Sequence, residues 1–192
     1  MGIDRDEDGS GGARLATREV YRGRVVNLDL DTVRFPDGST GEIEMMRHSG
    51  AAAVLPVSRV LDGGDPEVVL IRQYRYATGG YIHEVPAGRP AFAGEAWEEC
   101  ARRELEEETG MRAGALSRLT TIYTTPGFTD ERIHLFVASG LTEGTVAHDA
   151  DEFLEVVRIP FSETLEMVHD GRIVDAKSIC ALLYAAVFGM GF

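Results

Sequence analysis

Apolar and polar residues alternate along the segment VVNLDLDTVRF, residues 25–35, in a pattern that predicts a strand. Val26, Leu28 and Leu30 alternate there with one asparagine and two aspartates, which is typical of a half-buried strand. The residues PDGS (36–39) then favour a turn, and GEIEMMRH (41–48) returns as a second strand. This part of the chain is therefore predicted to form a hairpin.

Longer apolar runs follow and predict the main sheet. AAAVLPV (51–57) and EVVLIRQYR (67–75) are separated by the loop LDGGDP. Four further segments have strand character: YIHEVPAG (81–88), LTTIYTT (119–125), IHLFVASG (133–140) and LEVVRIP (154–160). Two helices are predicted after them, FSETLEMVHDG (161–171) with Ser162 as its N-cap, and AKSICALLYAAVFG (176–189). The pattern favours an α+β fold, an α/β/α sandwich with a mixed sheet.

The domain organisation follows from the same patterns. Residues 1–13 are polar, acidic and rich in glycine, and are expected to be a disordered tail. Residues 14–48 are expected to form an N-terminal antiparallel strand subdomain, and residues 49–192 are expected to form the main domain.

Composition narrows the possible partners. The 192-residue chain has a formal net charge of -13, which disfavours nucleic acid and anionic membranes as partners. Its two cysteines, Cys100 and Cys180, fit a reducing compartment. The N-terminus does not resemble a signal peptide, and the apolar run near residue 180 is too short to span a bilayer. We therefore expect a cytoplasmic protein without a membrane partner.

The segment RRELEEETG (102–110) concentrates four glutamates within residues 104–108. On a helical wheel Trp97, Ala101 and Leu105 form the inward seam, and Glu104 and Glu108 fall on that same side. An ordinary solvated helix surface is the alternative interpretation. However, Glu104 and Glu108 repel each other and lie at the negative end of the helix dipole. Burying such charges requires a positive partner, and carboxylates suit Mg²⁺ or Mn²⁺.

The spacing of these residues resembles the signature of the Nudix hydrolases. Glu95, seven residues and then RELEEETGM (103–111) match every position of the second part of that signature. The first part differs, because six residues separate Gly88 from Glu95 where the signature has five. This difference predicts a loop longer by one residue before the helix.

The resemblance implies a role for each matching residue. Glu104, Glu107 and Glu108 would bind the metal with the backbone carbonyl of Ala87. Arg103 would orient the glutamates through hydrogen bonds. Arg103 and Glu107 would be catalytic residues. Gly88 and Glu95 would shape the loop, and Gly110 would end the helix.

Other segments resemble the ADP-ribose pyrophosphatase branch of this family: RHSGAAAVLPV (47–57), IRQYR (71–75), EVPAG (84–88), PGFTDE (126–131) and DAKSICALLYA (175–185). In that branch a loop glutamate after the signature, here Glu131, is a general base or an additional metal ligand. A glutamate of the signature is the alternative base.

The same resemblance implies substrate contacts from Arg75, Arg47, Glu84 and Gly127, although an ordinary solvated arginine is an equal alternative for Arg47. It also implies that the N-terminal subdomain of residues 14–48 serves dimerisation, so that the protein is a homodimer, and that residues 49–192 form the catalytic domain.

The function implied is Mg²⁺-dependent hydrolysis of a nucleoside diphosphate derivative, foremost ADP-ribose to AMP and ribose 5-phosphate. Other substrates are alternatives: a GDP-sugar, an oxidised nucleotide or flavin adenine dinucleotide. A non-catalytic module that binds a nucleotide is the alternative from another functional class.

Overall fold

The chain folds into two compact units. The computed structural model describes residues 12–60, 64–145 and 153–189. One unit contains the described residues before Gly50 together with Tyr123–Glu131, and the other contains Gly50–Ile122 and the described residues from Arg132 onward. The first unit thus extends the N-terminal subdomain predicted over residues 14–48 by a segment that lies far away in the sequence.

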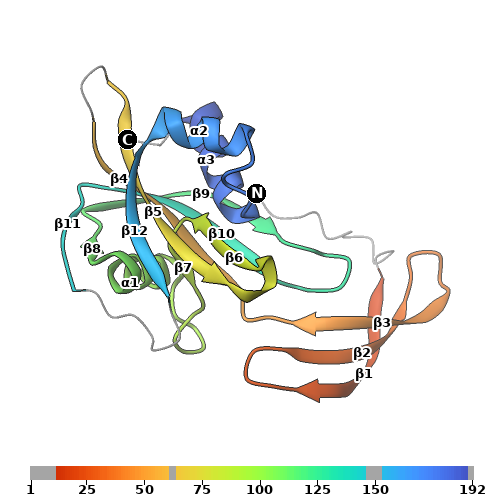
Figure 1. Cartoon of the computed structure of the whole chain (residues 1–192). Coiled ribbons are helices and arrows are strands. Elements are labelled where there is room, and N and C mark those ends of the chain that lie inside the picture. Colours follow the sequence, from red (N-terminus) through yellow and green to blue (C-terminus); the bar gives the residue numbers. More distant parts are fainter. Residues whose placement is uncertain (1–11, 61–63, 146–152, 190–192) are drawn as a thin grey trace. The chain divides into compact units, whose positions relative to one another are not determined.

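The first unit is built on a three-stranded antiparallel sheet, in the order β1-β2-β3 (Figure 1). Its strands are β1 (Ala13–Arg22), β2 (Asn27–Arg34) and β3 (Thr40–Arg47). β1 begins at Ala13, the final residue of the predicted tail, and residues 1–11 of that tail lie outside the described residues. The predicted β2–β3 hairpin is present, and its turn is closed by Asp37, whose Oδ1 accepts hydrogen bonds from Ser39 N and Oγ at 2.9 and 2.6 Å.

The alternation in β2 identifies the strand but does not identify its more buried face. Asp29 and Asp31 are the buried residues of this strand, whereas Leu28 and Leu30 are half-buried. Two features permit this burial: Arg47 forms ion pairs with both aspartates, and Thr17 Oγ1 donates a hydrogen bond to Asp31 Oδ1 at 2.7 Å. Buried carboxylates are tolerated when they are paired and hydrogen-bonded. The aspartates can therefore occupy the more buried face of β2, where apolar side chains would be expected.

The second unit is built on a seven-stranded mixed sheet. Its main path runs β12-β5-β4-β10-β9, with β6 paired to β5 and β7 paired to β4. β4 and β10 are parallel, whereas the β4–β5 and β5–β12 pairs are antiparallel. A separate two-stranded sheet consists of β8 and β11. The strands are β4 (Ala51–Val60), β5 (Pro66–Arg75), β6 (Gly80–Glu84), β7 (Ala87–Gly88), β8 (Met111–Arg112), β9 (Ala115–Tyr123), β10 (Arg132–Ser139), β11 (Thr142–Glu143) and β12 (Leu154–Pro160).

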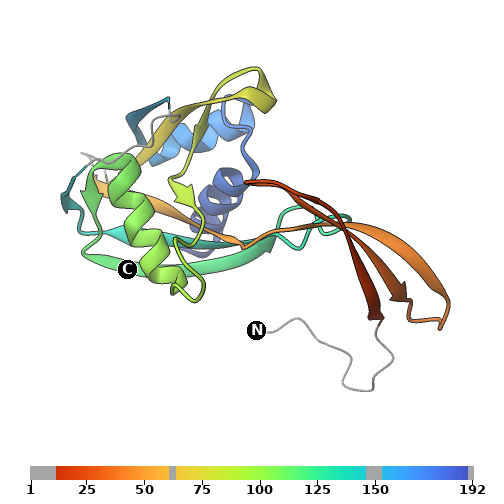
Figure 2. The same ribbon diagram turned by 90° about the horizontal axis from the view of Figure 1, so that it is seen from below.

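Helices cover both faces of this sheet, which places β4 at the centre of the core of this unit. The helices are α1 (Trp97–Thr109), α2 (Phe161–His169) and α3 (Ala176–Phe188), with the short 3-10 helix η1 (Tyr76–Thr78). Ala53 and Leu55 of β4 pack in the cluster that includes α2 and α3, whereas Ala52 and Val54 pack in the cluster that includes α1. Figure 1 shows α1 below the sheet and the other two helices above it, and α1 is nearest the viewer in Figure 2. The predicted α/β/α sandwich with a mixed sheet is confirmed.

The two predicted C-terminal helices are present, but α2 begins differently from the prediction. Its N-cap is Pro160, so the assignment of Ser162 as the cap is wrong. Ser162 instead donates hydrogen bonds from Oγ and N to the carboxylate of Asp65, at 2.8 and 3.2 Å. α3 begins as predicted after residue 175 and buries Leu182 in the core. No helix within the described part of the chain is long and apolar enough to cross a membrane.

Gly50, immediately before β4, allows α1 to pack closely against the sheet. Its φ is +84°, and a Cβ at this position would lie 2.8 Å from Cη2 of Trp97 and 3.3 Å from the carbonyl oxygen of Arg132. The Trp97 ring stacks on His134 at a centroid distance of 4.1 Å. An alanine here would meet both an unfavourable backbone conformation and a rigid aromatic ring.

Gly50→Ala should therefore lower the free energy of unfolding by about 2–4 kcal/mol, combining the left-handed backbone cost with overpacking. Gly171→Ala is the matched control, because Gly171 has φ +82° and a Cβ added there would have no other atom within 4 Å. This control should lose roughly 1–2 kcal/mol from the backbone alone. Chemical denaturation measures both values, and equal losses would show that contact with Trp97 costs nothing.

Candidate active site

Helix α1 presents its glutamates on defined sides. Cys100, Ala101 and Leu105 are fully buried against the sheet. Glu108 is 3% exposed and lies on the same side, whereas Glu98 is exposed to solvent. The helix ends at Gly110, whose φ of +68° provides the left-handed cap and whose N–H donates to the carbonyl of Glu106 at 2.8 Å.

The Arg103 guanidinium is the centre of the acidic cluster. It bonds the Glu95 carboxylate in a bidentate manner, at 3.1 and 3.2 Å, and its Nη1 donates to Glu104 Oε1 at 2.7 Å and Glu107 Oε2 at 2.9 Å. Nη2 also donates to the carbonyl of Arg89 at 2.8 Å. The hydrogen bonds to Glu95 raise the pKa of Arg103, and the same contact holds the pKa of Glu95 below its usual range. One positive charge is thus shared among three carboxylates.

Glu95 also closes the loop that precedes the helix. Its Oε2 accepts a hydrogen bond from the backbone N–H of Ala91 at 2.7 Å, four residues earlier. The six residues between Gly88 and Glu95 are consequently folded back on the glutamate that ends them.

The glutamates of α1 lie against the backbone of β7. A Cβ added to Gly88 would be 2.1 Å from the carboxyl carbon of Glu104, so this carboxylate rests directly on the glycine. The N–H of Ala87 donates to Glu108 Oε2 at 2.9 Å. On the same strand, the Cys100 thiol contacts the carbonyl of Gly88 at 3.6 Å, and burial raises the pKa of that thiol to about 11. Each residue of β7 therefore contacts one carboxylate of α1: Ala87 contacts Glu108, and Gly88 contacts Glu104.

The donor chemistry of this region fits a hard divalent cation. Carboxylate and backbone carbonyl oxygens are ligands that Mg²⁺ and Mn²⁺ accept. The three carboxylates around Arg103 carry more negative charge than one guanidinium balances. In the described ranges, no three acidic, histidine or cysteine side chains converge as a ready cage. Glu104 and Glu107 each direct an oxygen to Arg103, while Glu108 directs one to Ala87.

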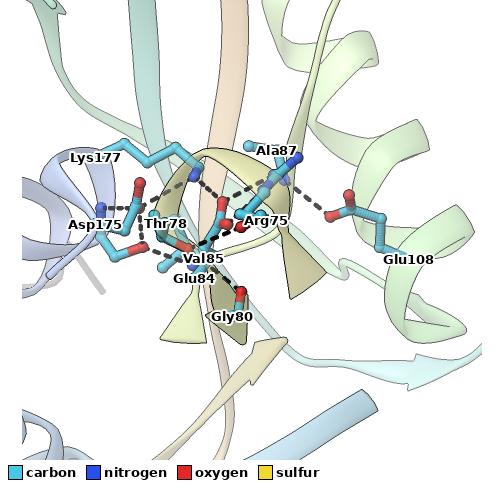
Figure 3. Close-up of polar contacts among 10 residues, drawn as sticks. Arg75, Thr78, Gly80, Glu84, Val85, Ala87, Glu108, Asp175 and Lys177 are labelled. Carbon is cyan, nitrogen blue, oxygen red and sulfur yellow. Dashed lines mark hydrogen bonds and ion pairs between the residues drawn. The ribbon is translucent and has the colours of Figure 1, made fainter. Parts of the chain in front are cut away.

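Arg75 and Glu84 form a second charged group beside this region (Figure 3). Glu84 is 1% exposed and accepts from Arg75 Nε at 2.6 Å and Nη2 at 2.9 Å, and it also pairs with Lys177. Burial opposes ionisation of Glu84, but the hydrogen bond from Arg75 and the charge of Lys177 outweigh it and lower its pKa. The side chain of Arg75 remains 42% exposed. Arg72 differs, since it stacks over the Tyr81 ring at 4.3 Å and pairs with Glu155.

Sequence reasoning assigned no role to the first turn of α3, which completes this group. Lys177 Nζ lies 3.1 Å from Asp175 Oδ2 as well as contacting Glu84. Asp175 is the N-cap of α3 and accepts hydrogen bonds from Ser178 N at 3.0 Å and Ser178 Oγ at 2.5 Å. The signal was present in the sequence DAKS, where an aspartate, a preferred N-cap residue, stands immediately before the predicted helix.

Three other predicted site residues belong to the first unit. Arg47 pairs there with Asp29 at 3.1 Å, with Asp31, and with Asp130 at 3.5 Å. These three ion pairs hold its guanidinium within the first unit. Gly127 has no positive φ and no atom near a Cβ position, so local geometry does not require a glycine there.

Glu131 lines a cavity of about 270 Å³ within the first unit, together with Arg47, His48 and Phe128 among others. Its Oε2 accepts from Thr124 Oγ1 at 2.8 Å, and its Oε1 lies 3.4 Å from His48 Nδ1. The neighbouring Asp130 has a different function, because its Oδ1 accepts from the backbone N–H of His48 at 2.8 Å. Asp130 thus fixes the loop to the end of β3.

Comparison with known proteins agrees with this geometry. Residues 50–182 match the NUDIX domain. The chain is 38% identical to a methanol dehydrogenase activator from Bacillus methanolicus and 37% identical to an ADP-ribose pyrophosphatase from Bacillus subtilis, each over 88% of this chain and 90% of the relative. It is also 39% identical to a GDP-mannose pyrophosphatase from Cronobacter sakazakii, over 85% of this chain and 88% of that protein. A crystal structure of an ADP compounds hydrolase superposes with a TM-score of 0.78 at 27% identity, covering 94% of this chain and 96% of that one.

The family model covers more than half of the chain, and two relatives exceed 30% identity over most of their length. The protein therefore belongs to the Nudix family of hydrolases.

The buried charge pair of Glu84 leads to a prediction about stability. Glu84→Gln keeps the shape but leaves Lys177 and Arg75 without their carboxylate, which should cost about 3–5 kcal/mol of unfolding free energy at neutral pH. Since folding lowers the pKa of Glu84 from 4.5, its stabilisation is present above about pH 4.5 and is lost as pH falls through the lowered value. The difference between variant and wild type should thus shrink in acid.

The control for this prediction is Glu155→Gln, which removes an exposed partner of Arg72. It should change stability by at most ~1 kcal/mol. Urea titrations from pH 3 to pH 7 separate the two variants. A Glu84 variant with wild-type stability at pH 7 would contradict the importance assigned to the buried pair.

Proposed function

We propose that this protein hydrolyses the diphosphate bond of ADP-ribose to AMP and ribose 5-phosphate, with Mg²⁺ or Mn²⁺ as cofactor. The observation that carries the proposal is the placement of Glu104 and Glu108 against the backbone of Ala87 and Gly88. This arrangement supports a metal site at the position that the Nudix signature implies. The choice of ADP-ribose is supported by the ADP-ribose pyrophosphatase relative, which aligns over most of both chains.

In this proposal Glu104, Glu107, Glu108 and the carbonyl of Ala87 hold the metal. When bound, such an ion neutralises phosphate oxygens and lowers the pKa of an attacking water. Arg103 keeps the carboxylates oriented, since its guanidinium already contacts Glu104 and Glu107. The rigid helix limits how far these side chains must move, which favours the preorganisation that catalysis needs.

Glu131 is proposed as the general base that accepts the proton of the attacking water. Its carboxylate has defined partners in Thr124 and His48, so its orientation is restrained. Asp130 is a weaker candidate because it bonds the backbone of His48 and pairs with Arg47. A glutamate of the signature remains the alternative base.

Arg75 is proposed to contact a phosphate of the substrate. Its guanidinium is held by Glu84 on one edge and is partly exposed, which leaves it accessible to an anion. Glu84 would therefore act on the substrate through Arg75. Arg47 is given a structural role, and Gly127 is retained as part of the loop that carries Glu131.

The quaternary structure proposed is a homodimer formed through the N-terminal strands. All ten residues of β1 are exposed in the single chain, including the apolar side chains of Leu15, Val20 and Tyr21. An exposed apolar edge of this kind is a common site of association.

A substrate panel tests the function directly. The purified chain is incubated with Mg²⁺ and ADP-ribose, GDP-mannose, flavin adenine dinucleotide or an oxidised nucleoside diphosphate, and released phosphomonoesters are measured with a coupled phosphatase. ADP-ribose should have the highest kcat/KM. GDP-mannose is the second candidate, since a GDP-mannose pyrophosphatase is 39% identical to this chain. If none of the compounds is cleaved, the proposed activity is wrong, and the same compounds are then tested for binding without cleavage.

The metal assignment is tested by removing charge without changing shape. Glu104→Gln and Glu108→Gln should each reduce kcat by more than about 100-fold, because losing even an outer partner of a metal ligand costs 10–100-fold. Glu98→Gln, on the exposed side of the same helix, is the control and should keep kcat near the wild-type value. A Glu108 variant with full activity at saturating Mg²⁺ would refute its assignment as a ligand.

The general base is tested by comparing two neighbouring acids. Glu131→Gln should reduce kcat by roughly 10²–10⁴-fold with little change in KM, the usual loss for a general base. Asp130→Asn keeps an oxygen for the His48 N–H and loses only a weak, exposed charge pair, so it should affect kcat much less. Steady-state kinetics at fixed Mg²⁺ distinguish them. A strongly impaired Asp130 variant beside an active Glu131 variant would place the base one residue earlier.

A further inference from the structure

The metal-binding segment Glu84–Gly88 changes its strand partner in the middle. β6 ends at Glu84 after pairing with β5, whereas β7 begins at Ala87 and pairs with β4. Val85 and Pro86 lie between them and belong to neither strand. Val85 is completely buried, so its backbone N–H needs a hydrogen-bond acceptor from outside the sheet.

Ser178 of α3 supplies this acceptor. Its Oγ accepts the hydrogen bond of Val85 N–H at 2.8 Å, although the two residues are 93 positions apart. Ser178 is itself completely buried, and its hydroxyl proton is directed to Asp175 Oδ2 at 2.5 Å. Because the proton is committed to Asp175, the lone pairs of the same oxygen are available to Val85. Figure 3 shows Val85 and Asp175 beside the Glu84 charge pair.

We infer that Ser178 is a positioning residue for the metal site, acting through the backbone of Val85. Two residues after Val85, Ala87 donates to Glu108, and the next residue, Gly88, supports the carboxylate of Glu104. The segment is also held to β4, because Val54 N–H donates to the carbonyl of Pro86 at 3.0 Å and Ala87 pairs with Ala53. Val85 sets the direction in which the chain enters this pairing, and through it the placement of Ala87, Glu104 and Glu108. Ser178 contacts none of these ligands directly, so its effect on the metal is transmitted through the chain. This inference rests on the metal-dependent function proposed above.

The first turn of α3 holds the segment at two consecutive residues. Lys177 pairs with Glu84, and Ser178 bonds Val85, while Asp175 contacts both Lys177 and Ser178. Two adjacent anchor points restrain the direction of the backbone as well as its position. The restraint lies one step beyond the direct partners of metal ligands that are known to tune metal affinity.

Removing a buried hydroxyl that has only a structural role would lower the free energy of unfolding without changing the affinity for metal. This difference defines the experiment. Mn²⁺ binding to the full chain without substrate is measured by electron paramagnetic resonance, at a temperature where every variant is folded. Ser178→Ala should raise the dissociation constant for Mn²⁺ by up to about 10-fold, the lower end of the range for a direct partner of a metal ligand. Ser178→Thr, which retains the hydroxyl, should restore most of the affinity.

Thr164→Ala is the matched control. Thr164 is also completely buried, and its hydroxyl bonds the carbonyl of Phe161 at 2.6 Å within α2. This variant should lose stability but bind Mn²⁺ as the wild type does. Ser178→Cys provides a second test if the alanine variant does not fold, because a thiol of similar size is a weak acceptor.

The inference is overturned if a folded Ser178→Ala or Ser178→Cys protein binds Mn²⁺ as tightly as the wild type, or if Thr164→Ala weakens binding equally. If the wild-type protein in the same experiments binds Mn²⁺ and cleaves ADP-ribose, such a result refutes the role of Ser178 only. The proposed function is then unaffected. Wild-type protein that binds no Mn²⁺ removes the metal-dependent function together with the inference.

Discussion

The shared guanidinium of Arg103 is the interaction on which the rest of the site depends. Four glutamates in five positions near the C-terminus of a helix repel one another and meet the negative end of the helix dipole. Arg103 offsets this by bonding Glu95, Glu104 and Glu107 at once. A lysine could not provide the same contacts, because a planar guanidinium has several donors in fixed directions. The charge that remains in excess is what makes the region suitable for a divalent cation.

The sheet provides the second requirement, which is a backbone segment placed against those carboxylates. β4 is buried on both faces, so α1 on one side and the pair α2 and α3 on the other are fixed relative to the same strand. The segment from Glu84 to Gly88 crosses from β5 to β4 and thereby reaches α1. Small residues at Ala87 and Gly88 let the glutamates approach the main chain. The site is consequently a product of packing on both sides of the sheet.

The sequence allowed much of this arrangement to be predicted, because helical periodicity alone separates the sides of α1. The burial of Glu108 and the exposure of Glu98 follow from that periodicity. Long-range pairing was not accessible in the same way. Asp29 and Asp31 alternate with apolar residues, yet they are buried because Arg47, at the end of another strand, neutralises them. The association of residues 123–131 with the first unit likewise involves contacts that no local pattern encodes, among them the bonds of Asp130 to His48 N–H and of Met46 N–H to the carbonyl of Phe128. Ser162 was misassigned for a similar reason, since its partner Asp65 is distant in the sequence.

The bond between Val85 and Ser178 also has a consequence for the order of folding. Its two ends are 93 positions apart, so a long loop must close before the bond can form, and contacts of such separation are slow and entropically costly. A chain synthesised only as far as β12 can contain every glutamate of α1 and still leave the Val85 N–H without this acceptor. The geometry required for catalysis is therefore expected to mature after the sheet itself, when α3 docks. Acquisition of activity during refolding would then lag behind the formation of secondary structure.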